Sequence, residues 1–344
     1  MEYEPFSLAL RSPLSTAAGS ISRREGFLIR VKRDGAGGIG EATPLPGWTE
    51  SYAECGDALA ATQDPESILG ETDETGRPLH TAARHGVELA VADAEARAAE
   101  VSLAASLADG TPADTVPVNA TLGDGTVDAT AEAARGAVEN GFSAVKVKVG
   151  ARDPDVDETR LRAVREAAGD GVELRADANG AWDAQTATRL LDVAADLDFS
   201  YVEQPLEAAD VEGHTDLRGR GVDVALDESL ASVGVEQILA ADAADVLVCK
   251  PMALGGPVRT LDVARRASER GVDVVVTTTI DAVVARVGAV HVAAALPNVS
   301  ACGLATGSML ADDLAPDPAP VEEGTIRVPE GPGLAGPAFA TLRR

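Results

Sequence analysis

The feature that most constrains the fold is a series of short apolar segments that recur along the middle of the chain. From Val116 onward they alternate with Ala-rich stretches, and successive segments start roughly 22–28 residues apart, the length of one strand, one helix and two short loops. We expect strands at 116–120, 144–149, 172–176, 200–202, 222–226, 246–248 and 272–276, with a last one near Ala301. About eight such units in series close most naturally into a ring. The pattern therefore predicts an α/β fold, a modified (β/α)8-type barrel over 116–310, with a doubly wound open sheet as the alternative.

Two regions of different texture flank the predicted barrel. Residues 1–115 combine expected strands at 6–10 and 27–31 with expected helices around 50–62 and 80–108, which predicts an α+β capping domain. Residues 311–344 are rich in Pro, Gly and acids, with an expected short strand at 325–328. We expect this last segment to return to the capping domain and complete it.

Charged residues and one amide, Asn179, stand at the expected ends of five consecutive barrel strands. In strand order they are Lys146 and Lys148, then Arg175, Asp177 and Asn179, then Glu203, Asp227 and Lys250. The carboxyl ends of barrel strands surround one mouth, and alternate residues of a strand point to the same side. We therefore expect Asp177, Glu203 and Asp227 to lie together, with lysines on either side of them.

Three carboxylates from separate strands predict a site for a hard divalent cation, Mg²⁺ with Mn²⁺ as a possible substitute. A cation there would offset the charge that develops when a proton leaves the carbon beside a carboxylate. A neutral lysine could take that proton, and nearby cations favour the neutral form. The only lysines in the chain are Lys32, Lys146, Lys148 and Lys250. Because arginine stays protonated, the few lysines retained point to chemistry that arginine cannot perform.

Five short motifs resemble the enolase superfamily, specifically its muconate-lactonizing subgroup. They are K-x-K at 146–148, D-x-N at 177–179, E-Q-P at 203–205, D-E-S at 227–229 and K-P at 250–251. Within the subgroup, residues 40–48 (GEATPLPGW), 174–182, 250–256 and 302–307 are most similar to the o-succinylbenzoate synthases of menaquinone biosynthesis. The resemblance implies Lys148 as the base, Lys250 as the group that steadies the anion from the opposite face, and Mg²⁺ on the three carboxylates.

The resemblance implies a lyase that dehydrates 2-succinyl-6-hydroxy-2,4-cyclohexadiene-1-carboxylate to o-succinylbenzoate. N-acylamino-acid racemases, dipeptide epimerases and cycloisomerases of the subgroup remain alternatives. The family often has a Ser-Ser pair and a nearby glutamate after the seventh strand, where this chain has Thr277, Thr278, Thr279 and Asp281. We expect Thr278 and Thr279 to contact a substrate carboxylate, with Lys146, Arg175 and Asn179 in support. The dipeptide epimerases tend to carry a D-x-D near the eighth strand, and residues 301–303 contain none.

Two hypotheses from other functional classes each leave part of the pattern unexplained. A Schiff-base aldolase using Lys250 leaves the three carboxylates unexplained. An inactive metal-binding scaffold leaves the retained lysines unexplained. The literal G-x-G-x-x-G at 35–40 is followed by Glu-Ala-Thr-Pro, which cannot begin a helix there, so we interpret it as a hairpin turn. The acidic run 153–157 reads as a capped helix start.

Charge constrains the partners and the compartment. The net charge is −27, from 56 acidic and 29 basic residues, which argues against nucleic acid or an anionic membrane as partner. The acids are dispersed, which suggests adaptation to a high-salt cytoplasm. The chain has neither a membrane-spanning apolar run nor a signal-peptide pattern, and its three cysteines form no C-x-x-C pair. We expect a cytoplasmic enzyme acting on a small carboxylate, of an oligomeric state that the sequence does not indicate.

Overall fold

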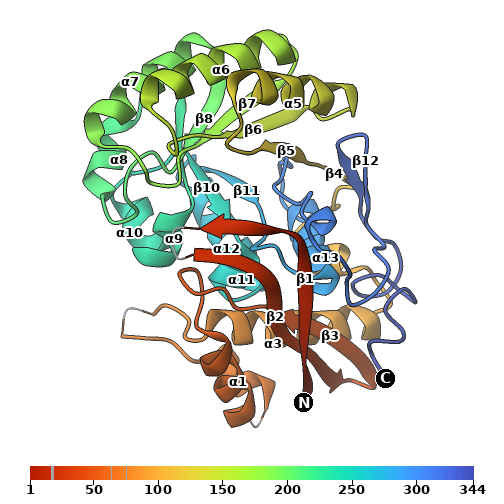
Figure 1. Cartoon of the computed structure of the whole chain (residues 1–344). Coiled ribbons are helices and arrows are strands. Elements are labelled where there is room, and N and C mark those ends of the chain that lie inside the picture. Colours follow the sequence, from red (N-terminus) through yellow and green to blue (C-terminus); the bar gives the residue numbers. More distant parts are fainter. Residues whose placement is uncertain (17–18, 63, 75) are drawn as a thin grey trace.

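The centre of the computed structural model is a sheet of seven parallel strands, β5 to β11 in sequential order. The structure describes residues 1–16, 19–62, 64–74 and 76–344 (Figure 1). The strands are β5 (Asn119–Leu122), β6 (Ala144–Lys148), β7 (Glu173–Asp177), β8 (Phe199–Glu203), β9 (Asp223–Leu226), β10 (Val246–Cys249) and β11 (Asp273–Val276). β10 is buried along its whole length, as expected for a parallel strand covered on both sides.

The sheet closes into a ring through residues 301–303. Val118 forms a parallel bridge with Cys302, and Thr277 forms one with Gly303. The backbone N–H of Asn119 donates to Cys302 over 3.0 Å, and that of Gly303 donates to Val276 over 2.9 Å. The predicted barrel is therefore confirmed, and the open doubly wound sheet is wrong. The eighth position, expected as a strand near Ala301, holds two isolated bridges instead.

Helices surround the barrel and pack an apolar stripe against it. They are α5 (Val127–Glu139), α6 (Pro154–Ala168), α7 (Ala184–Asp196), α8 (Val211–Leu217), α9 (Glu228–Ser232), α10 (Val235–Ala240), α11 (Pro251–Leu254), α12 (Pro257–Ser268) and α13 (Val283–Ala294). In α7, Ala187, Leu190, Leu191 and Ala194 are buried at helical spacing. The start of α6 is capped by Asp153, whose side chain accepts the N–H of Asp155, as the acidic run predicted.

The N-terminal region forms a three-stranded antiparallel sheet with helices packed on it. The strands are β1 (Glu2–Thr16), β2 (Gly19–Arg33) and β3 (Ala36–Ala42), and the helices are α1 (Tyr52–Ala61), α2 (Pro65–Leu69), α3 (Thr81–Ala98) and α4 (Leu103–Leu107). The hairpin turn expected over 35–40 occupies only Asp34 and Gly35, and the other glycines lie in β3. A Cβ on Gly40 would lie 1.9 Å from the carbonyl oxygen of Gly86 on α3. Glycine at position 40 thus lets the helix approach the strand.

The C-terminal segment crosses back over both parts of the molecule (blue in Figure 1). It contains η1 (Gly307–Met309), β12 (Val321–Glu322) and β13 (Thr325–Arg327), and β13 pairs with β4 (Thr115–Pro117). Its end contacts the N-terminal helices and strands: Leu334 N–H donates to Asp93 on α3 over 2.8 Å, and Arg30 Nε on β2 donates to Leu342 over 2.6 Å. Within the described ranges, no helix is long and apolar enough to cross a membrane.

Candidate active site

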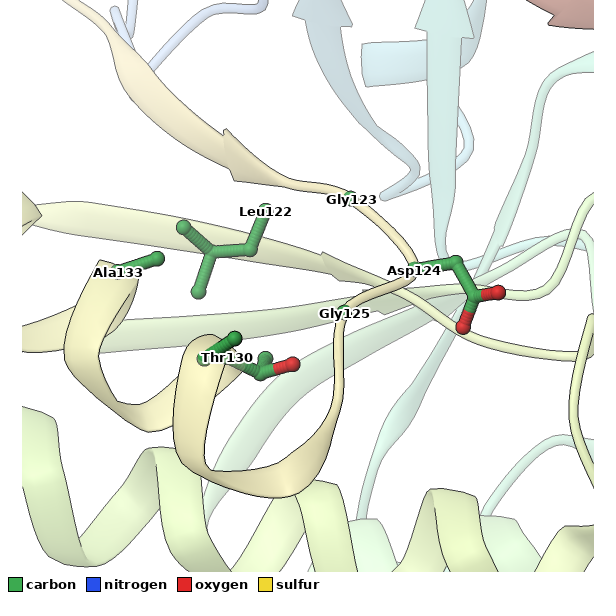
Figure 2. A pocket seen from close by; sticks show the side chains of 7 residues that line it. Leu122, Gly123, Asp124, Gly125, Thr130 and Ala133 are labelled. Atoms are coloured by element: carbon green, nitrogen blue, oxygen red, sulfur yellow. The ribbon is translucent and has the colours of Figure 1, made fainter.

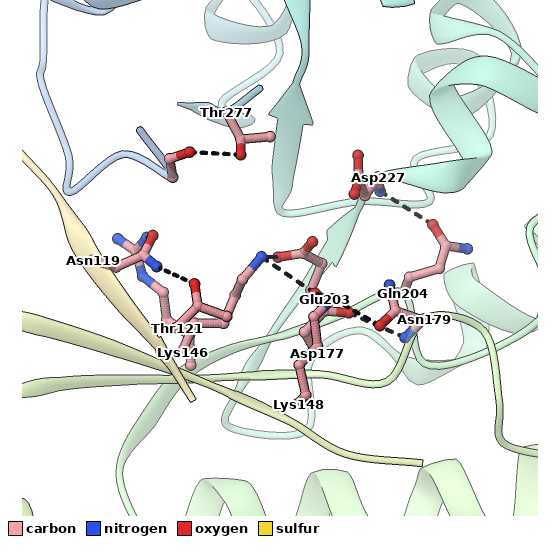
Figure 3. A network of polar contacts seen from close by, with 12 residues as sticks. Asn119, Thr121, Lys146, Lys148, Asp177, Asn179, Glu203, Gln204, Asp227 and Thr277 are labelled. Carbon is pink, nitrogen blue, oxygen red and sulfur yellow. Dashed lines mark hydrogen bonds and ion pairs between the residues drawn. The ribbon is translucent and has the colours of Figure 1, made fainter. Parts of the chain in front are cut away.

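Five of the predicted residues meet at the ends of β6, β7 and β8 (Figure 3). Sheet register sets Lys148 beside Asp177, and Asp177 beside Glu203. Lys146 Nζ lies 2.7 Å from Glu203 Oε2 and 3.2 Å from Asp177 Oδ2. Lys148 Nζ lies 2.6 Å from Asp177 Oδ2 and 2.8 Å from Asn179 Oδ1. The strand-end pattern therefore does bring these side chains into one network.

Lys250 approaches the carboxylates from the other side. It follows β10, and its Nζ donates to Oδ2 of Asp227, which follows β9. The same Nζ lies 3.5 Å from the centroid of the Trp48 ring, close enough for a cation–π interaction. Trp48 belongs to the loop between β3 and α1, and its place in the GEATPLPGW motif does not predict this contact. Lys148 and Lys250 thus contact different carboxylates, and the N-terminal region places the Trp48 ring against Lys250.

The carboxylates differ in their electrostatic surroundings. Burial raises the pKa of Glu203 to about 8, and the neighbouring charge of Asp177 adds to this effect. Burial alone would also raise the pKa of Asp177, but the ammonium groups of Lys146 and Lys148 outweigh it and lower that pKa. For Lys146, burial opposes the charged form, and attraction to Glu203 and Asp177 still raises its pKa. Lys146 therefore stays cationic and partly compensates the two acids beside it.

The donor set fits a hard divalent cation. Among the described residues, Glu203 Oε1, Asp227 Oδ1 and Glu228 Oε2 are buried oxygens without a hydrogen-bond partner. Such oxygens are costly unless a cation or a donor compensates them. Within these described ranges, no group of three or more His, Cys, Asp or Glu side chains lies close enough together to hold a metal ion as the structure stands. The lysine ammonium groups contact the carboxylates in this arrangement, so metal binding requires the carboxylate and ammonium groups to shift apart.

Gln204 and Asn179 tie the strand ends together, each in the left-handed conformation (φ of 43° and 46°). Gln204 Oε1 accepts the N–H groups of Asp227 and Ser229, both over 3.1 Å, which fixes the backbone that carries Asp227. Asn179 Nδ2 donates to Glu228 Oε1 over 2.9 Å. These bonds give a structural role to Gln204 in the E-Q-P motif and to Glu228 in the D-E-S motif, which the motif pattern alone does not predict.

Arg175 and the two threonines lie outside this network. Arg175 is one strand alternation below Asp177, inside the barrel, where it donates to Ala301 over 2.6 Å and stacks 4.9 Å from the Tyr201 ring centroid. The hydroxyl of Thr278 is 2.9 Å from that of Thr306. Thr279 donates its hydroxyl hydrogen to Asp281. In this structure both threonine hydroxyls are therefore engaged within the protein.

Arg160 is a buried residue that sequence reasoning missed. It lies on α6, and its Nη1 donates to the backbone oxygen of Lys148 over 3.0 Å. Its Nη2 donates to Gly123 over 2.9 Å, and Asp157 pairs with it at 2.7 Å. Arg160 thus fixes the backbone that presents Lys148. An arginine in the middle of an amphipathic helix gives no signal of this role in the sequence.

Two hollows lie at this end of the barrel. One, of about 290 Å³, follows β5 (Figure 2) and is lined by Leu122, Gly123, Asp124, Gly125, Ala129, Thr130 and Ala133. Asp124 is paired there with Arg152. The other is a small pocket whose lining includes Trp48, Asp227 and Lys250. Only the second contains predicted site residues.

Two sequence-family profiles match the chain. One described as "Enolase C-terminal domain-like" matches residues 128–336. The other, described as "Mandelate racemase / muconate lactonizing enzyme, N-terminal domain", matches residues 5–107. Together they confirm the superfamily that the five motifs resemble.

Curated relatives carry several different activities. The o-succinylbenzoate synthase of Thermobifida fusca (strain YX) is 34% identical, covering 93% of this chain and 86% of its own length. The N-succinylamino acid racemase of an Amycolatopsis species is 30% identical, covering 97% and 93%. A chloromuconate cycloisomerase of Pseudomonas sp. (strain P51) is 29% identical, covering 94% and 92%. The relatives agree on the family and differ in their reactions.

Solved structures resemble this one over nearly its whole length. The dipeptide epimerase of Methylococcus capsulatus, complexed with Mg and the dipeptide L-Arg-D-Lys, is 26% identical, with a TM-score of 0.84 and coverage of 97% of this chain and 98% of that chain. The muconate lactonizing enzyme of Pseudomonas fluorescens, complexed with muconolactone, is 25% identical, with a TM-score of 0.85 and coverage of 100% and 98%.

Proposed function

The chain belongs to the mandelate racemase / muconate lactonizing enzyme family of the enolase superfamily, and from that membership we propose that its barrel mouth removes a proton from the carbon beside a carboxylate in a Mg²⁺-dependent reaction. One observation carries this proposal. Lys148 and Lys250 contact a row of three buried carboxylates from different sides, at Asp177 and Asp227 respectively. A base on one side and a fixed cation on the other suit the formation of an anion between them.

Each residue has a proposed task. Asp177, Glu203 and Asp227 would hold Mg²⁺, which when bound would offset the charge that develops on the substrate carboxylate. Lys148, with 36% of its side chain exposed, is the more accessible of the two lysines, and in its neutral form it would take the proton. Lys250, with 10% exposed beside Trp48, would stay in place as an ammonium group and stabilise the anion.

We further propose that the reaction is the dehydration of 2-succinyl-6-hydroxy-2,4-cyclohexadiene-1-carboxylate to o-succinylbenzoate. The 34% identity to a synthase over 93% of the chain supports this choice, as does the lack of a D-x-D at 301–303. Lys148 would take the proton from the carbon beside the carboxylate. The C–O bond would then break, the departing hydroxyl would receive that proton from Lys148 and leave as water, and the ring would become aromatic.

A direct assay tests the proposed reaction. The purified protein is incubated with the cyclohexadiene precursor and MgCl₂, and the absorbance of the aromatic product is followed. We expect product to form with the wild type and to stop when a chelator is added. Absence of product from folded protein under saturating precursor and Mg²⁺ would reject the dehydratase assignment.

An N-succinylamino acid racemase is the second candidate. A racemase that is 30% identical over 97% of this chain favours it, as do lysines on both sides of the carboxylate row. Racemisation requires both lysines to act as bases, one for each enantiomer. Incubating N-succinyl-L- and N-succinyl-D-amino acids in D₂O distinguishes the candidates. If Lys148→Ala and Lys250→Ala each abolish α-hydrogen exchange for one enantiomer only, the chain is a racemase.

A further inference from the structure

The helices α12 and α13 follow β10 and β11, and neither begins with a capping side chain of its own. The residue before α12 is Gly256 and the residue before α13 is Ala282, and neither makes a side-chain hydrogen bond to the first turn. The first N–H groups of a helix have no partner within the helix. Ala282 is buried, so the acceptors for the N–H groups at the start of α13 must come from other parts of the chain.

Glu41 supplies the acceptors for α13. It lies on β3 in the N-terminal sheet and is fully buried. Its Oε1 accepts the N–H of Ala282 and its Oε2 that of Ala285, both over 2.8 Å. Between them, the N–H of Val283 donates to Asp313 of the C-terminal segment over 2.9 Å. The carboxyl group of a residue from another domain therefore takes the place of the missing capping side chain.

Glu88 does the same for α12. It lies on α3, and its Oε2 accepts the N–H of Val258 over 2.9 Å and that of Arg259 over 3.4 Å. The space in front of this helix is shaped for the carboxylate, because a Cβ on Gly256 would lie 2.0 Å from Glu88 Oε2. Gly256 also has a φ of +141°, which side-chain-bearing residues rarely adopt. The barrel is thus built to receive an acid from the N-terminal domain.

The position of Glu41 is electrostatically unfavourable, which calls for a structural reason. Burial and the nearby charge of Asp281 raise the pKa of Glu41 to about 8, against the opposing effect of hydrogen bonds from Thr43 and Ala285. Two buried carboxyl groups close together raise the free energy of the folded state unless hydrogen bonds or opposite charges compensate them. The two helix N–H groups that Glu41 accepts across the domain boundary supply such hydrogen bonds.

The loop that enters α13 is strained and is held from the same side. Ile280 has a φ of +61°, an unusual conformation for a β-branched residue. Arg24 on β2 donates from Nε to the carbonyl oxygen of Ile280 over 3.1 Å, and Glu41 holds Ala282 two residues later. The N-terminal domain therefore fixes the loop at 277–281, which carries Thr278 and Thr279.

We propose that the N-terminal domain is fixed to the barrel by two interdomain helix caps, and that Glu41 is a positioning residue that holds the loop at 277–281 beside the barrel mouth. The capping itself is independent of the reaction. The effect on substrate rests on the proposed function, in which this loop lies beside the substrate.

Amide hydrogen exchange measured by NMR on the full chain tests the caps without any substrate. In Glu41→Gln we expect exchange at Ala282 and Ala285 to rise by roughly tenfold or more, with faster exchange at 278–281 and none of this at Val258 and Arg259. Glu88→Gln is expected to give the reverse pattern. The interdomain caps are rejected if each variant speeds amide exchange equally at the starts of α12 and α13. They are also rejected if neither variant speeds exchange at either start.

Asp93→Asn is the matched control. Asp93, on α3 like Glu88, is a buried acid that accepts two backbone N–H groups, but its recorded polar partners are Ile39, Leu334 and Arg343, which lie outside α12 and α13. We expect its thermal midpoint to fall while exchange at α12 and α13 stays at the wild-type level. Faster exchange at these helix starts in Asp93→Asn as well would show that the starts report only global stability, and would overturn the proposal.

Kinetics test the positioning role, with the substrate that the wild type turns over. We expect kcat/KM of Glu41→Gln to fall by roughly tenfold, mainly through KM, while Asp93→Asn stays within about threefold of wild type. Unchanged KM in Glu41→Gln, despite faster exchange at 278–281, would reject the positioning role and leave the caps intact. A wild type inactive on all the named substrates would reject the proposed function, and the exchange experiment would still decide the caps.

Discussion

At the scale of single residues, Lys148 is the side chain on which the proposed mechanism depends most. Its Nζ is held by Asp177 and Asn179 at 2.6 and 2.8 Å, and its backbone oxygen by Arg160. We expect Lys148→Ala to lower turnover by roughly 10²–10⁴-fold, the range for a lost general base, and to stop exchange of the substrate α-hydrogen in D₂O. Lys148→Arg should do no better, because guanidinium keeps its proton. Rates and deuterium incorporation are measured together.

Lys32 provides the control for this experiment. It is exposed on β2 and lies outside the site, so Lys32→Ala should keep wild-type exchange. Continued α-hydrogen exchange in Lys148→Ala, together with its loss in Lys250→Ala, would reverse the assignment of base and anion-stabilising group.

The three carboxylates carry a second prediction. We expect Asp177→Ala, Glu203→Ala and Asp227→Ala each to abolish activity while the circular dichroism spectrum stays that of a folded protein, because each would remove a ligand of one metal ion. Calorimetric titration with Mg²⁺ measures the loss of binding directly. Asp124→Ala, outside the carboxylate row but at the same end of the barrel, should retain binding. Full wild-type activity after exhaustive chelation would contradict a metal-dependent reaction.

Strand ends were the part of the site that sequence could predict, because strand alternation and the barrel rule fix where Lys146, Lys148, Asp177 and Glu203 must point. Hydroxyl partners could not be predicted in the same way. Thr278 meets Thr306 from a loop 28 residues away, and that contact depends on how two irregular loops fold. Trp48 reaches Lys250 from another domain, which no local pattern could indicate.

At the scale of secondary structure, the sequence indicated most barrel strands to within two residues and failed where tertiary contacts decide. The helix expected over 80–108 is two helices, α3 and α4. They separate at Val101 and Leu103, whose backbone groups bond Gly333 of the C-terminal segment. The strand expected over 116–120 divides at Val118, since β4 pairs with β13 and β5 pairs with β6. In each case the partner comes from a distant part of the chain.

His291 connects α13 to α4 and to the C-terminal segment. Its burial predicts how the free energy of unfolding depends on pH. It lies on α13, its Nδ1 accepts the N–H of Ala104 on α4, and its Nε2 lies 2.6 Å from the carbonyl oxygen of Leu334. Burial lowers its pKa from 6.5 to about 4. Between these values the unfolded chain binds more protons than the folded one. The contribution of neutral His291 to the free energy of unfolding is therefore fully present above pH 6.5. It is lost as the pH falls toward 4, by up to about 3 kcal/mol.

Urea unfolding at pH 7 and at pH 4.5 measures this dependence. His291→Gln cannot gain a proton, so its free energy of unfolding should fall less between the two pH values than that of the wild type. The substitution His80→Gln, at a partly exposed position before α3, is the control for the loss of a histidine as such. An equal fall in wild type and His291→Gln would contradict the role of this residue.

At the scale of the whole molecule, the charge of −27 predicts a dependence on salt. Self-repulsion of a strongly charged surface opposes folding, and mobile ions screen it. We expect the thermal midpoint to rise between 0.1 M and multimolar KCl. Sucrose at matched osmolarity separates charge screening from exclusion of the cosolute. A midpoint that is the same at low and high KCl would leave the acidity without this explanation.

The contacts between α3 and the C-terminal segment have a consequence for biosynthesis. Asp93 is fully buried, and Arg343, which pairs with it at 3.2 Å, lies 250 positions later. At a translation rate of about 5–20 residues per second, the first domain spends many seconds outside the ribosome before this partner emerges. During that interval the nascent N-terminal sheet and α3 lack the residues that cover them. The N-terminal domain is thus completed long after its own residues are synthesised, and a stalled or prematurely released polypeptide would expose its unfinished surface to chaperones and proteases.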